Sequence, residues 1–318
     1  MNKLSPLIIL FFLIAFGQNL FAQRNVVKIS FEDYEKEAEA LVIDKNYDGA
    51  IDIYSKLLSQ NPSKEKKYEY YLLTGDAYLS QKKYSNALSG YNSAAALYNR
   101  YEARLKIGDT LLKSDLFTLA ERSFLDVLDK NKRSDFAKRR LGDIYLKQGI
   151  YLKSLQYYES VDHFYLDRAT IINMSKAYRI VGQSEKAIEL VRKYLRYSDD
   201  AEILFMLGVL YGDIGDYNKA EENFLASIAI DGSNYAAFLY AAAIYEGNQD
   251  LAKAKSFLLK ASSLNPSIAL TDLMLSRISY KMKDMTGAKK YALSAQKKAD
   301  TQFMAQQAQR MVDFYNGK

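Results

Sequence analysis

The sequence predicts an all-α protein built as a helical solenoid, with about eight helix-turn-helix repeats followed by a C-terminal capping helix. Alanine recurs about every 34 residues, which indicates a repeated unit of two helices. Only three prolines occur among the 318 residues, and this scarcity favours long helical stretches. The recurring residues are Ala50, Ala87, Ala120, Ser154, Ala187, Ala220, Ala254 and Ala288, with serine in place of alanine once.

The stretch 204–224 shows the unit most completely. Its leucine, glycine and tyrosine residues between 204 and 211 lie at i, i+3, i+4 and i+7, which places them on one face of a helix. An alanine and a phenylalanine four residues apart then share a face of a second helix. Between the two patterns, Gly215 suits the left-handed position after a helix and Asp216 suits the cap of the next one. We therefore expect two helices joined by a tight turn, packed closely at Gly208.

This pattern resembles the tetratricopeptide repeat (TPR), with its bulky residue, Leu-Gly, Tyr, then Ala and an aromatic residue. The resemblance covers residues 31–302 and implies a right-handed superhelix in which the first helix of each repeat lines the concave surface. No tryptophan occupies the fourth position, where the family often has one, and the eighth repeat matches least well. Extra residues at 63–67 are expected to lengthen the first junction. The repeats are expected to start near residues 31, 68, 101, 135, 168, 201, 235 and 269.

Residues 1–22 have the features of a secretory signal peptide. Lys3 precedes an unbroken apolar run at 7–16, and Ala22 offers a small residue before a cut at Gln23. An uncleaved membrane anchor is the alternative, but the run is shorter than the roughly 20 residues that a spanning helix needs. We therefore expect an exported protein, periplasmic or secreted, with no membrane span after signal removal. Because the chain has no cysteine, a lipid-modified N-terminal cysteine is excluded and a lipoprotein is not expected.

The two ends of the repeat array are also predicted. Residues 23–30 are expected to form a linker, and Ser30 with Asp33 matches a capping box at the start of the first helix. Residues 303–318 are expected to form a capping helix and tail that cover the apolar face of the last repeat. No glycine- or serine-rich linker interrupts the array, so the sequence predicts one continuous domain between these ends.

No residue pattern in the chain indicates catalysis. The absence of cysteine excludes disulfides, thiolate metal sites and cysteine nucleophiles. The single histidine, His163, lies in an irregular stretch and is interpreted as structural, since a metal site needs further ligands. The G-x-x-G match at 212–215 follows a helix, where the dinucleotide-binding motif would need a strand before it. We expect no enzyme activity, no cofactor and no metal.

The TPR resemblance places candidate partner-binding residues at positions 2, 5, 9 and 12 of each repeat, counting its first residue as position 1. These positions change along the chain from acidic through basic to apolar. Neutral drift, and packing between neighbouring helices, could also produce this gradient. The candidate groove residues are Glu35, Asp76, Asp109, Arg139, Lys176, Arg179, Phe205, Val209, Leu239, Leu273 and Tyr280.

The leading functional hypothesis is a non-enzymatic scaffold or adaptor of the bacterial cell envelope that binds protein or peptide partners. The alternative is a cell-wall or carbohydrate-binding accessory module, in which Tyr240, Tyr245 and Tyr280 would stack on sugars. The net charge of +6 is modest and both signs are mixed along the chain. A basic stretch at 130–140 could contact an anionic partner, but nucleic-acid binding conflicts with export and is not expected. The sequence does not define the oligomeric state.

Overall fold

The computed structural model describes residues 30–98, 100–162 and 166–317. The predicted signal peptide, the linker before Ser30 and His163 lie outside the described residues. The described part of the chain contains seventeen helices, α2 to α18, and no strand. This confirms the all-α prediction.

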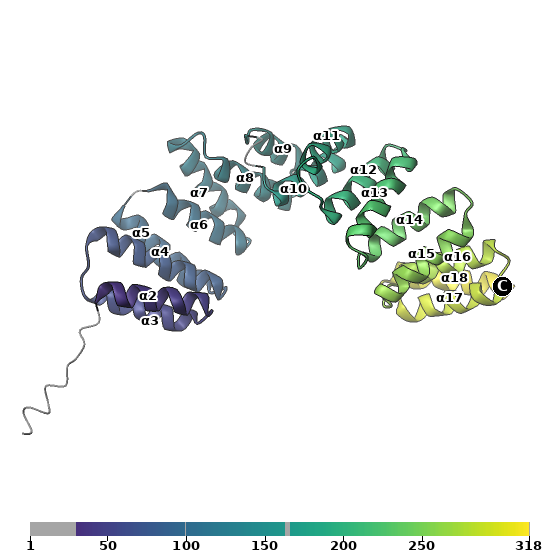
Figure 1. Cartoon of the computed structure of the whole chain (residues 1–318), viewed down its shortest axis with the longest axis horizontal. Helices are drawn as coiled ribbons and strands as arrows, with labels where there is room; N and C mark the ends of the chain where they lie inside the picture. The colour runs from purple at the N-terminus through teal and green to yellow at the C-terminus, as the bar shows by residue number, and fades with distance from the viewer. Residues whose placement is uncertain (1–29, 99, 163–165, 318) are drawn as a thin grey trace, which may run out of the picture. The chain divides into compact units, whose positions relative to one another are not determined.

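Figure 1 shows the helices labelled and coloured in chain order. They fall into two compact units, with the boundary between Lys132 and Arg133. The repeat pattern gave no sign of this division. The first unit contains α2 (Phe31–Ile43), α3 (Tyr47–Ser59), α4 (Lys64–Ser80), α5 (Tyr84–Leu97), α6 (Tyr101–Lys113) and α7 (Phe117–Lys130). The second contains α8 (Asp135–Lys147), α9 (Tyr151–Glu159), α10 (Arg168–Ile180), α11 (Ser184–Leu195), α12 (Ala201–Asp213), α13 (Tyr217–Ile230), α14 (Tyr235–Gly247), α15 (Leu251–Leu264), α16 (Ala269–Lys281), α17 (Met285–Lys298) and α18 (Gln302–Tyr315).

The helices form the expected pairs, from α2 with α3 to α16 with α17, and α18 follows as the single additional helix. The first helix of a pair begins at the residue expected from the sequence in each repeat except the second. There α4 begins at Lys64, because Ser63 caps it by accepting a hydrogen bond from the amide of Lys66. The extra residues of the second repeat therefore extend a helix at its N-terminus, and they do not lengthen the junction.

The turn between paired helices has the predicted chemistry. Gly215 has φ +80°, in the left-handed region, and the side chain of Asp216 accepts a hydrogen bond of 3.2 Å from the amide of Lys219. The predicted capping box is also present, since Ser30 and Asp33 exchange side-chain to backbone hydrogen bonds. Local signals thus set where these helices begin and end.

Close packing within a repeat depends on a glycine opposite an aromatic ring. A Cβ atom added to Gly208 would lie 2.6 Å from Cε1 of Phe224, far inside van der Waals contact. Gly75 has the same relation to Tyr91, at 2.4 Å. The missing side chain at position 8 thus makes room for the ring at position 24, and Ala220 is buried beside it.

The apolar core runs along the helices as separate clusters. In the second unit one cluster extends from Leu155 to Ile278. At its C-terminal end, α18 packs on α17, and Tyr315 is buried against Ala288 and Ala292. This is the capping helix that the sequence predicted.

Candidate functional site

Two apolar grooves open between consecutive first helices, one in each unit, at the same repeat positions. The α2–α4 groove has a volume of about 380 Å³ and the α12–α14 groove about 460 Å³. Each is bounded by positions 9, 12 and 13 of one first helix and positions 6, 9, 10 and 13 of the next. Positions 17 and 24 of the second helix between them complete the lining.

The α12–α14 groove lies beside the best-preserved repeat in the sequence. Phe224 and Ala220 of α13, with Val209 of α12 and Ile244 of α14, supply its apolar lining. A Cβ atom added to Gly212 or to Gly247 would meet no atom within 4 Å. The two glycines therefore leave open space at the groove, and the backbone there is accessible to a partner.

The helices that border the α12–α14 groove lack the ion pair found at the next junction. Between α14 and α16, the guanidinium of Arg277 donates two hydrogen bonds, of 2.8 and 2.6 Å, to the carboxylate of Glu246. Glu246 occupies position 12 of its repeat, and Arg277 occupies position 9 of the following repeat. The same positions at the α12–α14 groove hold Ala243 and Gly212, which cannot bridge the two helices.

The preceding junction, between α10 and α12, is also bridged. Arg179 donates to Asp213 at 2.6 Å, and this hydrogen bond raises the pKa of the guanidinium above its usual value. Asp213 also lines the α12–α14 groove, and its ion pair with Arg179 already balances its charge. The groove therefore favours an apolar group over a second cation.

Aromatic rings cluster at one end of the α12–α14 groove. The ring centroids of Phe205, Phe224 and Tyr240 lie 5.4 to 5.7 Å from one another. Tyr240 is 46% exposed, so part of its ring is available to a ligand. Tyr245, the other candidate for sugar stacking in this repeat, is buried; burial and the hydrogen bond with Glu221 raise its pKa to about 12.

Other junctions contain a connected set of polar groups, here called the polar trio. The hydroxyl of Tyr91 donates to Asp76 at 2.6 Å, and the ammonium of Lys106 on the next first helix contacts both carboxylate oxygens at 2.8 Å. The trio thus consists of position 24, position 9 and position 6 of the following repeat. The fourth repeat has the same arrangement in Tyr158, Asp143 and Asn173.

Most of the charged residues predicted for the groove take part in interactions within the chain. Asp76 belongs to the polar trio above. The other pairs are Glu35 with Lys66 and Tyr70, Asp109 with Lys113, Arg139 with Asp167, and Arg179 with Asp213. Lys176 is exposed and makes no ion pair with a described residue. The predicted charge gradient is therefore largely a set of contacts that hold helices together.

The predicted apolar groove residues are distributed differently. Val209 lines the α12–α14 groove, and Phe205 packs against Phe224 and Tyr240, two rings that line it. Leu239 is only 8% exposed and packs in the core, and Leu273 is partly buried. Tyr280 is exposed against the rings of α18. Positions 6, 10 and 13 also line the grooves, and the TPR resemblance, which implies positions 2, 5, 9 and 12, does not include them.

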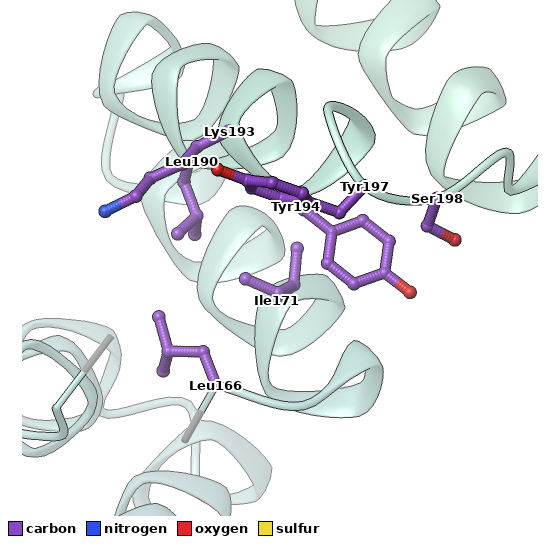
Figure 2. Close-up of a pocket in the computed structure, with 7 residues that line it drawn as sticks. All are labelled: Leu166, Ile171, Leu190, Lys193, Tyr194, Tyr197 and Ser198. Atoms are coloured by element: carbon purple, nitrogen blue, oxygen red, sulfur yellow. The ribbon is translucent and has the colours of Figure 1, made fainter. Parts of the chain in front are cut away.

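A third hollow, of about 740 Å³, lies in the second unit at α10 and α11 (Figure 2). Figure 2 shows Leu166 lying below the side chains of Ile171, Leu190, Tyr194 and Tyr197. Tyr197 is 87% exposed. Leu166, which lines this hollow, is the first described residue after the gap at 163–165.

Within the described ranges, no three His, Cys, Asp or Glu side chains are grouped so as to hold a metal ion. None of the helices α2 to α18 is long and apolar enough to cross a membrane.

Comparison with protein families finds matches to one kind of repeat in several segments of the chain. Models described as tetratricopeptide repeat match residues 35–102, 105–165, 201–234 and 238–268. These segments make up more than half of the sequence and include both grooves.

Individual relatives are similar at low identity. The chain is 22% identical over 213 residues to the TPR repeat-containing protein MJ1428 of Methanocaldococcus jannaschii, covering 64% of this chain and 37% of the relative. It is 33% identical over 108 residues to the BBSome complex member BBS4 of Bos taurus, covering 34% and 20%. The matched regions thus span well under half the length of these relatives. Among solved structures, the APC/C hetero-tetramer Cut9–Hcn1 is similar with a TM-score of 0.53 and 14% identity, over 95% of this chain and 59% of that one. At this identity the similarity shows the fold alone.

Proposed function

This chain belongs to the tetratricopeptide-repeat family, and from that premise we propose that it is a non-enzymatic scaffold or adaptor of the bacterial cell envelope. It binds a peptide or protein partner on the surface formed by the first helices of its repeats. The observation that carries the proposal is the α12–α14 groove, where an apolar lining is left open between two helices. A fold built for protein–protein interaction supports the same assignment.

The proposed partner inserts an apolar side chain between α12 and α14. Val209, Ile244 and Phe224 would contact this side chain, and the ring of Tyr240 would cover one end of it. The open space at Gly212 and Gly247 lets the partner backbone approach closely. Because the groove is formed by packed helices, little conformational entropy is lost from the scaffold on binding.

The envelope location is proposed from the N-terminal sequence. Residues 1–22 resemble a cleaved signal peptide, so the exported protein would begin at Gln23. N-terminal sequencing of the protein from fractionated cells tests this. An intact Met1 on protein in the cytoplasmic fraction would contradict it.

The binding proposal is tested by closing the groove with the ion pair of the neighbouring junction. The double substitution G212E/A243R places Glu at position 12 and Arg at position 9, copying Glu246 and Arg277. Random 12-residue peptides are first selected by display on the unchanged protein. We expect the major family of selected peptides to contain apolar or aromatic residues and to bind the double variant at least about tenfold more weakly, about 1.4 kcal/mol.

The control makes the same two changes on the surface away from the groove. The substitutions A229R and G232E add the same side chains at exposed positions of α13 and the turn after it. They should leave peptide affinity unchanged, and thermal melting should show both double variants folded. Equal affinity for all three proteins would show that the selected peptides do not use the α12–α14 groove. Glycan binding lost only in the groove variant would favour the carbohydrate-binding alternative.

A further inference from the structure

The α2–α4 groove contains an incomplete polar trio. The three matching positions hold Tyr54, Glu39 and, on the next first helix, Leu73. Leu73 stands where Lys106 and Asn173 supply a donor in other junctions. In the first repeat, therefore, the carboxylate and the hydroxyl are present and the donor from the neighbouring helix is absent.

The hydroxyl of Tyr54 forms no hydrogen bond with any described residue, and two sequence differences explain this. At position 8 of the second repeat, a Cβ atom on Gly75 would lie 2.4 Å from the ring of Tyr91. The first repeat has Ala38 at that position, so its Cβ atom keeps the ring of Tyr54 out of the equivalent place. Glu39 is also one methylene longer than the aspartate of a complete trio.

Both unused polar groups line the groove. Tyr54 is only 2% exposed, yet it borders the groove with Glu39 and Leu73. The groove also exposes aliphatic surface, because Val42 is 37% and Ile43 79% exposed at the end of α2. A ligand here would meet acceptor oxygens at one point and aliphatic carbon along its length.

One carboxylate at this groove, that of Glu39, forms no ion pair with a described residue. Burial, followed by the charges of Glu39, Asp76 and Glu69, raises the pKa of Tyr54 above its ordinary value. The hydroxyl therefore stays protonated across the physiological range, and its oxygen can accept a hydrogen bond. Lys106 pairs with Asp76 and Lys66 pairs with Glu69, so Glu39 is the carboxylate left to attract a cationic donor in the groove.

We propose that the α2–α4 groove binds a lysine side chain of a partner polypeptide. The ammonium group donates to the carboxylate of Glu39 and to the hydroxyl oxygen of Tyr54, taking the part that Lys106 plays in the next repeat. The aliphatic stem lies along Ile43 and Leu73, since lysine buries its methylene groups while its charge stays at a polar site. The chain would thus carry a lysine-selective site in its first unit, distinct from the apolar α12–α14 groove in its second. This inference rests on the proposed function only in taking the partner to be a polypeptide.

The test compares two small probes that differ only in the amine. N-acetyl-lysine methylamide and N-acetyl-norleucine methylamide are titrated into the purified protein, and the methyl NMR signals of Ile43 and Leu73 are followed. We expect the lysine probe to shift the Ile43 signal with a dissociation constant at least about tenfold lower than that of norleucine. The preference should weaken as salt rises, because charges at an exposed groove are screened.

Two substitutions decide between this proposal and simple apolar contact. E39Q removes the charge at nearly constant shape and should bring the two probes to equal affinity. L73K supplies the missing donor from within the chain and should abolish the shift of Ile43 by the lysine probe. If the NMR spectrum shows that L73K is unfolded, the E39Q result alone decides between lysine recognition and simple apolar contact.

Equal shifts by both probes in the unchanged protein, or a lysine preference that survives E39Q, would overturn the proposal. A second copy of the chain occupying the groove would appear instead as concentration-dependent shifts of Ile43 without probe, and would also count against it. The G212E/A243R variant should bind the lysine probe as the unchanged protein does. This separates a failure here from a failure of the α12–α14 groove.

Discussion

A few repeat positions determine which side-chain contacts form between neighbouring first helices. Where position 9 is aspartate and the next position 6 is Lys106 or Asn173, polar contacts join the helices. Where these positions hold Val209 and Tyr240, the contact is apolar and a groove remains. The candidate surfaces of this protein therefore arise from departures at single positions within a regular array.

The turn residue at position 15 gives a prediction for a single side chain. Lys82 has φ +60° at the position where Gly215 has +80°, and its side chain is exposed. A residue with a Cβ atom is strained in this region by roughly 1–2 kcal/mol. Replacing it by glycine removes the strain, but glycine loses more conformational entropy on folding, which offsets part of the gain. We expect K82G to stabilise the protein by about 0.5–1 kcal/mol in denaturant unfolding.

The reverse change at the equivalent turn is the matched control. G215A puts a Cβ atom on the left-handed residue and should destabilise by about 1 kcal/mol. An added Cβ there meets no atom within 4 Å, so the loss would report backbone strain alone. A stabilising G215A or a destabilising K82G would contradict the assigned turn.

At the scale of helices and turns, the sequence predicted most of what the structure shows. Periodic alanine, glycine and aromatic residues located the helix pairs because the same close contact recurs in each repeat. The start of α4 was misplaced by four residues, since the extra residues in the second repeat carry good helix-forming lysines after a capping serine. Local capping could have revealed this shift, whereas the repeat period alone could not.

The packing face of α12 provides a prediction for one element. Leu207 and Tyr211 are buried on this helix, and Lys219 at the start of α13 is exposed above the ring of Tyr211. Truncation of a buried side chain loses apolar contacts and leaves a cavity. L207A and Y211A should each lower the free energy of unfolding by about 2–5 kcal/mol, measured in urea.

K219A is the surface control for these substitutions. It should change the free energy of unfolding by no more than about 0.5 kcal/mol, because an exposed cation–π contact and a surface ion pair contribute little. Equal losses in all three variants would mean that the assigned faces of α12 and α13 are wrong.

At the scale of the whole molecule, the sequence predicted repeats but not the division at Lys132 and Arg133. The repeat period continues across this point, so nothing in the repeat pattern marks the boundary. The predicted partner-binding surface stays a prediction, and the structure shows which contacts its residues make within the chain. Charges such as Asp76 and Arg179 read as groove residues in the sequence, and the structure pairs them with side chains of neighbouring helices. Pairing between helices depends on side chains about 30 residues apart, which a single-position rule does not consider.

Each unit nevertheless carries one open groove at the same repeat positions, and the two differ in chemistry. The α2–α4 groove offers Glu39 and Tyr54 beside aliphatic surface, and the α12–α14 groove offers aromatic and aliphatic surface around Gly212. A partner engaging both would need a lysine in one segment and a bulky apolar residue in another.

The most direct test of the central claim is photo-crosslinking in living cells from the α12–α14 groove. A photoreactive phenylalanine analogue replaces Tyr240 at the groove or, as a control, the more exposed Tyr197 outside it. We predict a discrete crosslinked protein from position 240 that is absent from position 197 and is lost when G212E/A243R is added. No crosslink from position 240 above that from 197, or the same crosslinked protein after the groove is closed, would contradict the account.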